Sequence, residues 1–166
     1  MTRSSNSAQA VAPARPGGWA RADGVLFALA ATALVLIAAQ FGLAGFGAFT
    51  MDKTPTDNAY GVHVALGLVI AALTLLVLAA VLASRPARAH GRTRWLTITL
   101  AVLAVPVQTA LGEAGKHVPA VGGIHALNGL AIFVVTGWLT WETARRRAAD
   151  RATGAAAGGS AAGQSG

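Results

Sequence analysis

The chain has 166 residues and a formal net charge of +7, with 54% hydrophobic and only 11% charged residues. Soluble domains usually carry about a quarter charged residues, so the composition excludes an ordinary soluble domain. The chain contains no cysteine, which excludes disulfides, thiolate ligands, iron–sulfur clusters and covalently attached c-type haem.

Four segments lack Asp, Glu, Lys and Arg, namely residues 24–51, 58–84, 95–112 and 118–141. A transmembrane helix needs about 20 mostly apolar residues. We therefore predict an all-α integral membrane four-helix bundle, with helices at 25–49, 60–83, 95–111 and 121–141. The third helix is short, and we expect Pro106 to kink it. The first run is longer than a signal-peptide core, so we expect it to be retained as a helix.

The regions outside the spans differ in composition from the helical core. Residues from Asp150 onward are almost wholly Ala, Gly, Ser and Gln, and residues 1–18 are similar. Such segments lack the apolar content to pack. We therefore expect a transmembrane domain at 21–146 between two disordered cytoplasmic tails, 1–20 and 147–166.

Basic residues are distributed unevenly between the two sides of the predicted bundle. Of the 13 Lys and Arg residues, only Lys53 and Lys116 fall in the loops after the first and third helices. The others flank the opposite helix ends: Arg3, Arg15, Arg21, Arg85, Arg88, Arg92, Arg94, Arg145, Arg146, Arg147 and Arg151. Cytoplasmic loops are enriched in Lys and Arg. We therefore expect a multi-pass protein of the plasma membrane with both termini in the cytoplasm, and the net charge gives no reason to propose nucleic-acid binding.

One pattern of polar residues occurs twice. His63 and His125 each lie near the start of an apolar segment, and Gly67 and Gly129 follow them by four residues. Gln40 and Gln108 occupy matching places in the preceding apolar segments. This internal repeat predicts two parallel helical hairpins related by an axis along the membrane normal. Such an axis would place the two histidines at one depth, facing each other.

Paired imidazoles facing each other inside a helical bundle are typical of haem ligation. A glycine at i+4 shares a helix face with its histidine, so Gly67 and Gly129 would leave room for the flat ring. Gln40, Gln108 and Asn128 are candidates to hold the second imidazole nitrogen. Lys53 and Lys116 could meet haem propionates. The predicted cofactor is thus one b-type haem, with His63 and His125 as its metal ligands.

Other interpretations of the same residues remain open. Glycines four apart can serve close helix packing, a histidine near a helix end can be solvated, and Gln40 and Gln108 can form hydrogen bonds between helices. A zinc or copper site would need a third ligand, for which only His117 is a candidate. We expect His90, which lies among arginines, to be solvated.

The layout resembles one four-helix half of the haem A synthase family, in which histidines at the outer ends of the second and fourth helices ligate haem. His63 and His125 match those positions. The chain also resembles a small bacterial family of four-helix membrane proteins with Gln-x-x-x-Ala-Gly and His-x-x-x-Gly motifs, matched here from Gln40 and from His63. Haem A synthases carry a glutamate before the first histidine and usually an arginine after it, whereas Tyr60 and Val64 stand here. The resemblance therefore implies haem handling or electron transfer, as in a cytochrome b-like protein, rather than oxidative catalysis.

The expected partners are the lipid bilayer and either a redox partner or a second copy of the chain. The competing class of function is a cofactor-free structural or accessory subunit of a membrane complex.

Overall fold

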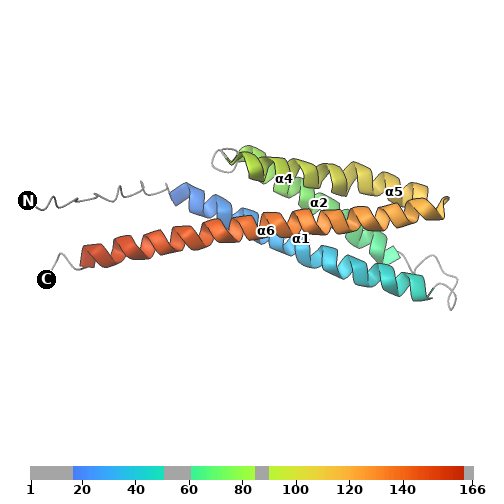
Figure 1. Ribbon diagram of the computed structural model, residues 1–166, viewed down its shortest axis with the longest axis horizontal. Helices are drawn as coiled ribbons and strands as arrows, with labels where there is room; N and C mark the ends of the chain where they lie inside the picture. Colours follow the sequence, from blue (N-terminus) through green and yellow to red (C-terminus); the bar gives the residue numbers. More distant parts are fainter. Residues whose placement is uncertain (1–16, 51–60, 85–89, 163–166) are drawn as a thin grey trace, which may run out of the picture.

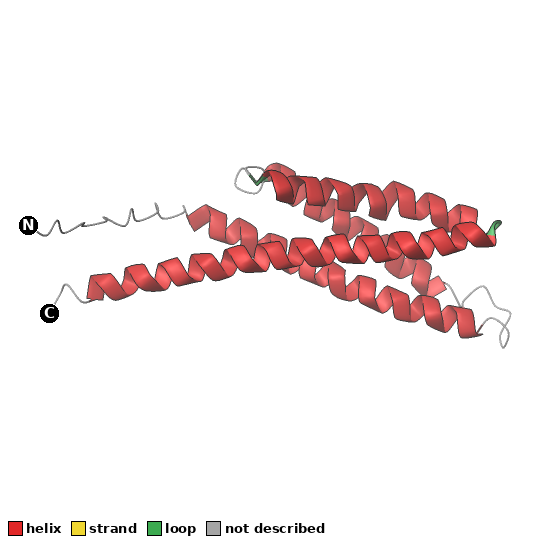
Figure 2. Cartoon of the chain, in the orientation of Figure 1, coloured by secondary structure: helices red, strands yellow, loops and turns green. Residues whose placement is uncertain are grey.

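The computed structural model describes residues 17–50, 61–84 and 90–162, and nearly all of them are helical. Helix α1 spans Gly17–Thr50 and helix α2 spans Gly61–Ala83. The third rod consists of α4 (Gly91–Val102), the π-helical turn η2 (Leu103–Val107) and α5 (Gln108–Gly115), and α6 spans Pro119–Ala162. No strand occurs in this part of the chain, and Figure 2 shows helices joined by short loops. The predicted all-α architecture with four helical rods is confirmed.

All four rods are long and apolar enough to cross a membrane. The candidate spans are Arg21–Ala48, Gly61–Ala83, Gly91–Gly115 and Pro119–Ala155. They contain the four predicted segments almost completely, apart from one residue at an end of each of the first two. Long apolar helices that satisfy their own backbone hydrogen bonds are one of the two structures that can span a bilayer. The chain is therefore described as a multi-pass membrane protein.

Pro106 does not break the third rod. A proline lacks the N–H of a normal helical bond, and its ring crowds the carbonyl four residues earlier. Here the chain widens into a π-helical turn, and the backbone N–H of Gln108 bonds to the carbonyl of Leu103, five residues earlier. The rod therefore continues through the proline.

The rods alternate in direction, as Figure 1 shows. Helix α1 packs against α2 and α6, while the third rod packs against α6 and, through α4 and η2, against α2. We call the end at which α2 and α6 begin the histidine end, and the end at which α1 begins and α6 finishes the arginine end. Among the described residues, no close backbone contact joins α2 to α5, so the bundle is less tightly closed at the histidine end.

The core lies mainly between the two ends of the bundle. Large, fully buried side chains include Leu26, Val77, Leu100 and Leu139. Several buried threonines lie among them: Thr74, Thr93, Thr97, Thr136 and Thr143. Thr97, Thr136 and Thr143 each donate to a carbonyl of their own helix, so these three are buried without costly loss of hydrogen bonds. The buried hydroxyl of Thr74 has no hydrogen-bond partner among the described residues.

The turn between α5 and α6 depends on a close approach of two backbones. A Cβ placed on Gly115 would lie 3.0 Å from the Cα of Gly122, which is tighter than packed carbon atoms allow. Helix α6 then begins at Pro119, whose missing N–H costs nothing in a first helical turn. This three-residue connection holds α5 and α6 together near His125.

The described parts of both expected tails are helical. Residues 1–16 lie outside the described part of the chain, and residues 17–20 form the start of α1. Residues 147–162, expected to be disordered, continue α6 as a helix, and Arg151–Ala155 are exposed. Alanine has the highest helix propensity, so an alanine-rich segment can extend an existing helix without tertiary packing.

Candidate cofactor site between two histidines

His63 and His125 face each other at the histidine end. Their ring centroids are 6.4 Å apart and the ring planes are inclined by 56°. His63 lies in the first turn of α2 and His125 in the second turn of α6, and both are half-buried. Residues 62 positions apart in the sequence are thus brought together from two different helical hairpins.

Gln108 contacts both nitrogens of the His125 imidazole. The Nε2 atom of Gln108 lies 3.2 Å from Nε2 of His125, and Nδ1 of His125 lies 3.2 Å from the backbone carbonyl of Gln108. A carbonyl can only accept, so Nδ1 must carry the proton. Nε2 is then the nitrogen with the lone pair, and it accepts from the Gln108 amide.

Asn128 determines which way the Gln108 amide points. Its Nδ2 donates to Oε1 of Gln108 at 2.6 Å and to the carbonyl of Leu103 at 3.0 Å. Because Asn128 donates, the acceptor oxygen of Gln108 must face it, and the amide nitrogen must face His125. A consistent network therefore runs from the π-helical turn through Asn128 and Gln108 to the histidine.

The corresponding glutamine of the first hairpin makes a different contact. Nε2 of Gln40 donates to the backbone carbonyl of His63 at 2.7 Å. Its Oε1 is buried and has no hydrogen-bond partner among the described residues. The place that corresponds to Asn128, three residues after the histidine, holds Leu66. The two halves of the site therefore differ in polarity.

The paired glycines lie against the two glutamines. A Cβ on Gly67 would lie 3.3 Å from Nε2 of Gln40, and a Cβ on Gly129 would lie 3.6 Å from Nε2 of Gln108. All seven residues singled out from the sequence are therefore gathered at the histidine end: Gln40, His63, Gly67, Gln108, His125, Asn128 and Gly129. The space that each glycine leaves is next to a carboxamide.

Sequence reasoning overlooked two residues of this site. A Cβ on Gly112 would lie only 3.2 Å from the ring of His125, so this glycine lets the imidazole lie flat on α5. Pro106 was noted only as a kink, but the wide turn around it includes the Leu103 carbonyl that Asn128 contacts. The spacing of Gly112, four residues after Gln108, is the signal that could have identified it.

The remaining histidines lie elsewhere. His117 is exposed in the turn before α6, and His90 precedes the first turn of α4 and is half-buried. Within the described residues, no group of three His, Cys, Asp or Glu side chains could hold a metal ion. Lys116 pairs instead with Glu113 at 2.6 Å, while Lys53 and Tyr60 lie outside the described residues.

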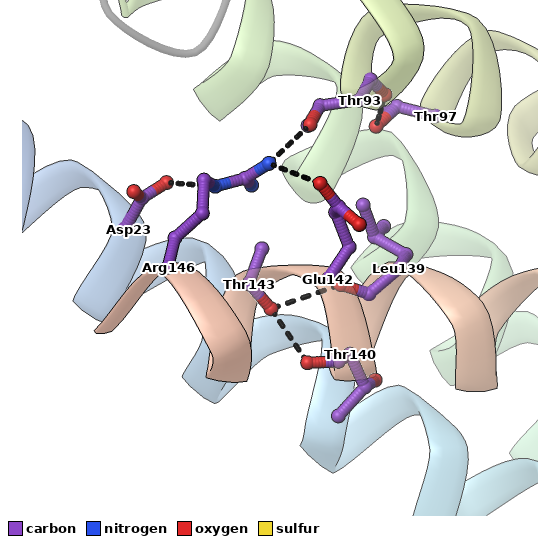
Figure 3. Close-up of polar contacts among 8 residues, drawn as sticks. All are labelled: Asp23, Thr93, Thr97, Leu139, Thr140, Glu142, Thr143 and Arg146. Carbon is purple, nitrogen blue, oxygen red and sulfur yellow. Dashed lines mark hydrogen bonds and ion pairs between the residues drawn. The ribbon is translucent and has the colours of Figure 1, made fainter. Parts of the chain in front are cut away.

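A second polar cluster occupies the arginine end (Figure 3). Arg146 is buried, and its Nε lies 3.3 Å from Oδ1 of Asp23 on α1. Its Nη1 donates to Thr93 on α4 at 2.9 Å and lies 3.4 Å from Glu142. One guanidinium thus joins α1, α4 and α6. The sequence analysis placed Arg146 with the flanking basic residues and did not anticipate this burial.

Comparisons with known proteins give no further information about this site. No family model, no curated protein and no solved structure matches the chain.

Proposed function

We propose that the chain binds one b-type haem between His63 and His125, for electron transfer or haem handling in a membrane. The observation that carries the proposal is the approach of the two imidazoles from separate hairpins, with ring centroids 6.4 Å apart. Neutral imidazole is a standard ligand of haem iron, and His63 and His125 would be the residues that hold it here.

The protonation of His125 also fits a ligand role. A metal binds the lone pair of a neutral imidazole, and a hydrogen bond to the other nitrogen fixes the tautomer. The Gln108 carbonyl supplies that bond at Nδ1. Nε2 is then the ligating atom, and the Gln108 amide, which contacts it at 3.2 Å, would have to turn aside. When bound, haem would supply one-electron redox chemistry, whereas the chain would supply ligands, a fixed tautomer and apolar surroundings.

The repeated motif supports a common role for the two halves of the site. We propose that the chain consists of two parallel repeated hairpins, α1–α2 and the third rod with α6. In each, a glutamine lies against a glycine one turn beyond a histidine. Both histidines then lie toward the same membrane face. We propose a location in the plasma membrane, and the distribution of arginines favours an orientation with both termini cytoplasmic and the histidine end outside.

A second candidate function is supported by a specific observation. The imidazole of His125 is hydrogen-bonded at both nitrogens by Gln108, and both glutamines lie against the glycines. The His125 half of the site, with such internal partners, needs no cofactor to compensate for burial. The alternative is thus a cofactor-free structural or accessory subunit of a membrane complex.

The visible absorption spectrum of the protein, purified in detergent from cells supplied with haem, separates the two functions. Under the haem proposal, the reduced protein shows sharp α and β bands of low-spin haem. His63→Ala and His125→Ala each abolish or convert these bands. His90→Ala is the matched control and leaves them intact. A folded, monodisperse and colourless wild-type protein would overturn the haem proposal in favour of the accessory subunit.

A further inference from the structure

The arginine end carries a group of arginine and tryptophan side chains that the histidine site does not involve. The guanidinium of Arg92 lies 4.5 Å from the ring centroid of Trp138, and that of Arg145 lies 4.7 Å from that of Trp141. Trp138 and Trp141 are 44% and 51% exposed. We call these four residues the arginine–tryptophan patch.

The helices α4 and α6 together form this patch. On α6, residues 138, 141 and 145 recur at helical spacing and share one face. Arg92, from the first turn of α4, reaches the same face by stacking on Trp138. This face points away from the core, because the buried residues of α6 in this region are Leu139, Thr143 and Arg146.

The two arginines of the patch differ from the neighbouring buried Arg146 in their carboxylate partners. Arg146 is compensated inside the bundle by Asp23 and Glu142. In the described part of the chain, no carboxylate pairs with Arg92 or Arg145. A guanidinium stacked on an aromatic ring uses its face, so its N–H groups, which lie in the plane, remain directed outward. These donors match the geometry of a phosphate group.

We propose that the arginine–tryptophan patch binds the headgroup of an anionic phospholipid. The phosphate would lie between Arg92 and Arg145, and the glycerol and upper acyl chain would lie against Trp138 and Trp141. Tryptophans concentrate at the membrane–water boundary, and Trp138 and Trp141 lie where the charge-free segment 118–141 ends, on the side of the arginine end. Two uncompensated positive charges favour an anionic lipid over a zwitterionic one, because a zwitterionic headgroup carries its own cation.

The proposal is tested by adding phosphatidylglycerol or phosphatidylcholine with identical acyl chains to the full chain in neutral detergent. Retained lipid is measured by native mass spectrometry and stability by thermal unfolding. Phosphatidylglycerol is expected to be retained preferentially and to raise Tm. Each arginine near a charged lipid surface contributes about 1 kcal/mol, so Arg92→Gln with Arg145→Gln should weaken phosphatidylglycerol binding about 30-fold.

The matched control is Arg21→Gln with Arg151→Gln, which removes the same charge outside the patch and should leave binding within about threefold. Equal weakening by both pairs would overturn a specific site in favour of general charge attraction. A Tm rise produced equally by inorganic phosphate would show that the patch binds a free anion instead. If the Arg92/Arg145 variant does not fold, direct competition on the wild-type protein decides, and equal retention of the two lipids overturns the proposal.

Discussion

The carboxamide of Gln108 and the imidazole of His125 hold each other in one arrangement. The backbone carbonyl of Gln108 accepts from Nδ1 of His125, while its side-chain amide faces Nε2. Asn128 removes the ambiguity of the amide by donating to its oxygen. Each donor in this series of three hydrogen bonds meets an acceptor. The tautomer of the neutral His125 ring therefore follows from hydrogen bonding alone.

Replacing Asn128 with leucine tests this relationship. Leucine is the residue at the corresponding place in the first hairpin, Leu66, so the change suits a membrane helix. Loss of the bond to Oε1 lets the Gln108 amide flip, and the buried oxygen loses its partner, which costs about 1–3 kcal/mol of stability. Nitrogen NMR of labelled histidine should show His125 protonated at Nδ1 in the wild-type protein and a mixture of tautomers in Asn128→Leu. An unchanged tautomer would contradict the role given to Asn128.

The buried ion pair between Arg146 and Asp23 makes a second prediction. Their side chains are 9% and 6% exposed, and leaving a buried charge without its partner costs about 3–5 kcal/mol. Glu142 still lies 3.4 Å from the guanidinium, so Asp23→Ala should lower the unfolding free energy in detergent by about 3 kcal/mol, the lower end of this range. The control is Glu113→Gln, which breaks the exposed pair with Lys116 and should have little effect, because water screens such pairs. Equal effects of the two variants would refute the structural importance of the Arg146 cluster.

Substitution of the paired glycines tests whether they serve close helix packing or leave space for a cofactor. In Gly67→Leu and Gly129→Leu, the new side chain must displace a glutamine amide that lies within 3.6 Å of the added Cβ. If the glycines leave room for haem, the ratio of haem to protein should fall while the apoprotein remains folded. If they only allow helices to approach, thermal stability should fall whether or not haem is supplied.

Gly123→Leu is the control for both measurements, since nothing lies within 4 Å of a Cβ at Gly123. If neither glycine variant differed from this control, neither Gly67 nor Gly129 would face a crowded site. The interpretation of the repeated motif as a built cavity would then fail.

The orientation of the chain in the membrane is checked with topology reporters. Fusions after Arg88 and after Arg147 should report the cytoplasm, because basic residues are retained on that side. Fusions near Thr56 and Val118 should report the outside. A reversed signal at any single site would remove the argument that His63 and His125 lie at the same membrane face.

Some features of this protein follow from local sequence. The four spans are predicted correctly because length and hydropathy decide whether a segment can cross a bilayer, and a helix there satisfies its own backbone. The order of Gln40, His63 and Gly67, repeated in Gln108, His125 and Gly129, also indicated which residues gather at one end. A polar residue that costs free energy inside a membrane can be recognised in an apolar segment even when the packing of the helices is unknown.

Other features depend on how the helices pack together. The spans are apolar on every side, so their sequence does not mark the face that turns inward. In the sequence Arg146 cannot be told from its neighbours Arg145 and Arg147, and it is buried only because Asp23 and Thr93 reach the same height from other helices. Likewise, Asn128 reaches Gln108 and Leu103 only because α6 packs beside the widened turn at Pro106. Composition therefore decided that the chain forms four spanning helices, whereas their rotation and relative height decided which polar groups meet.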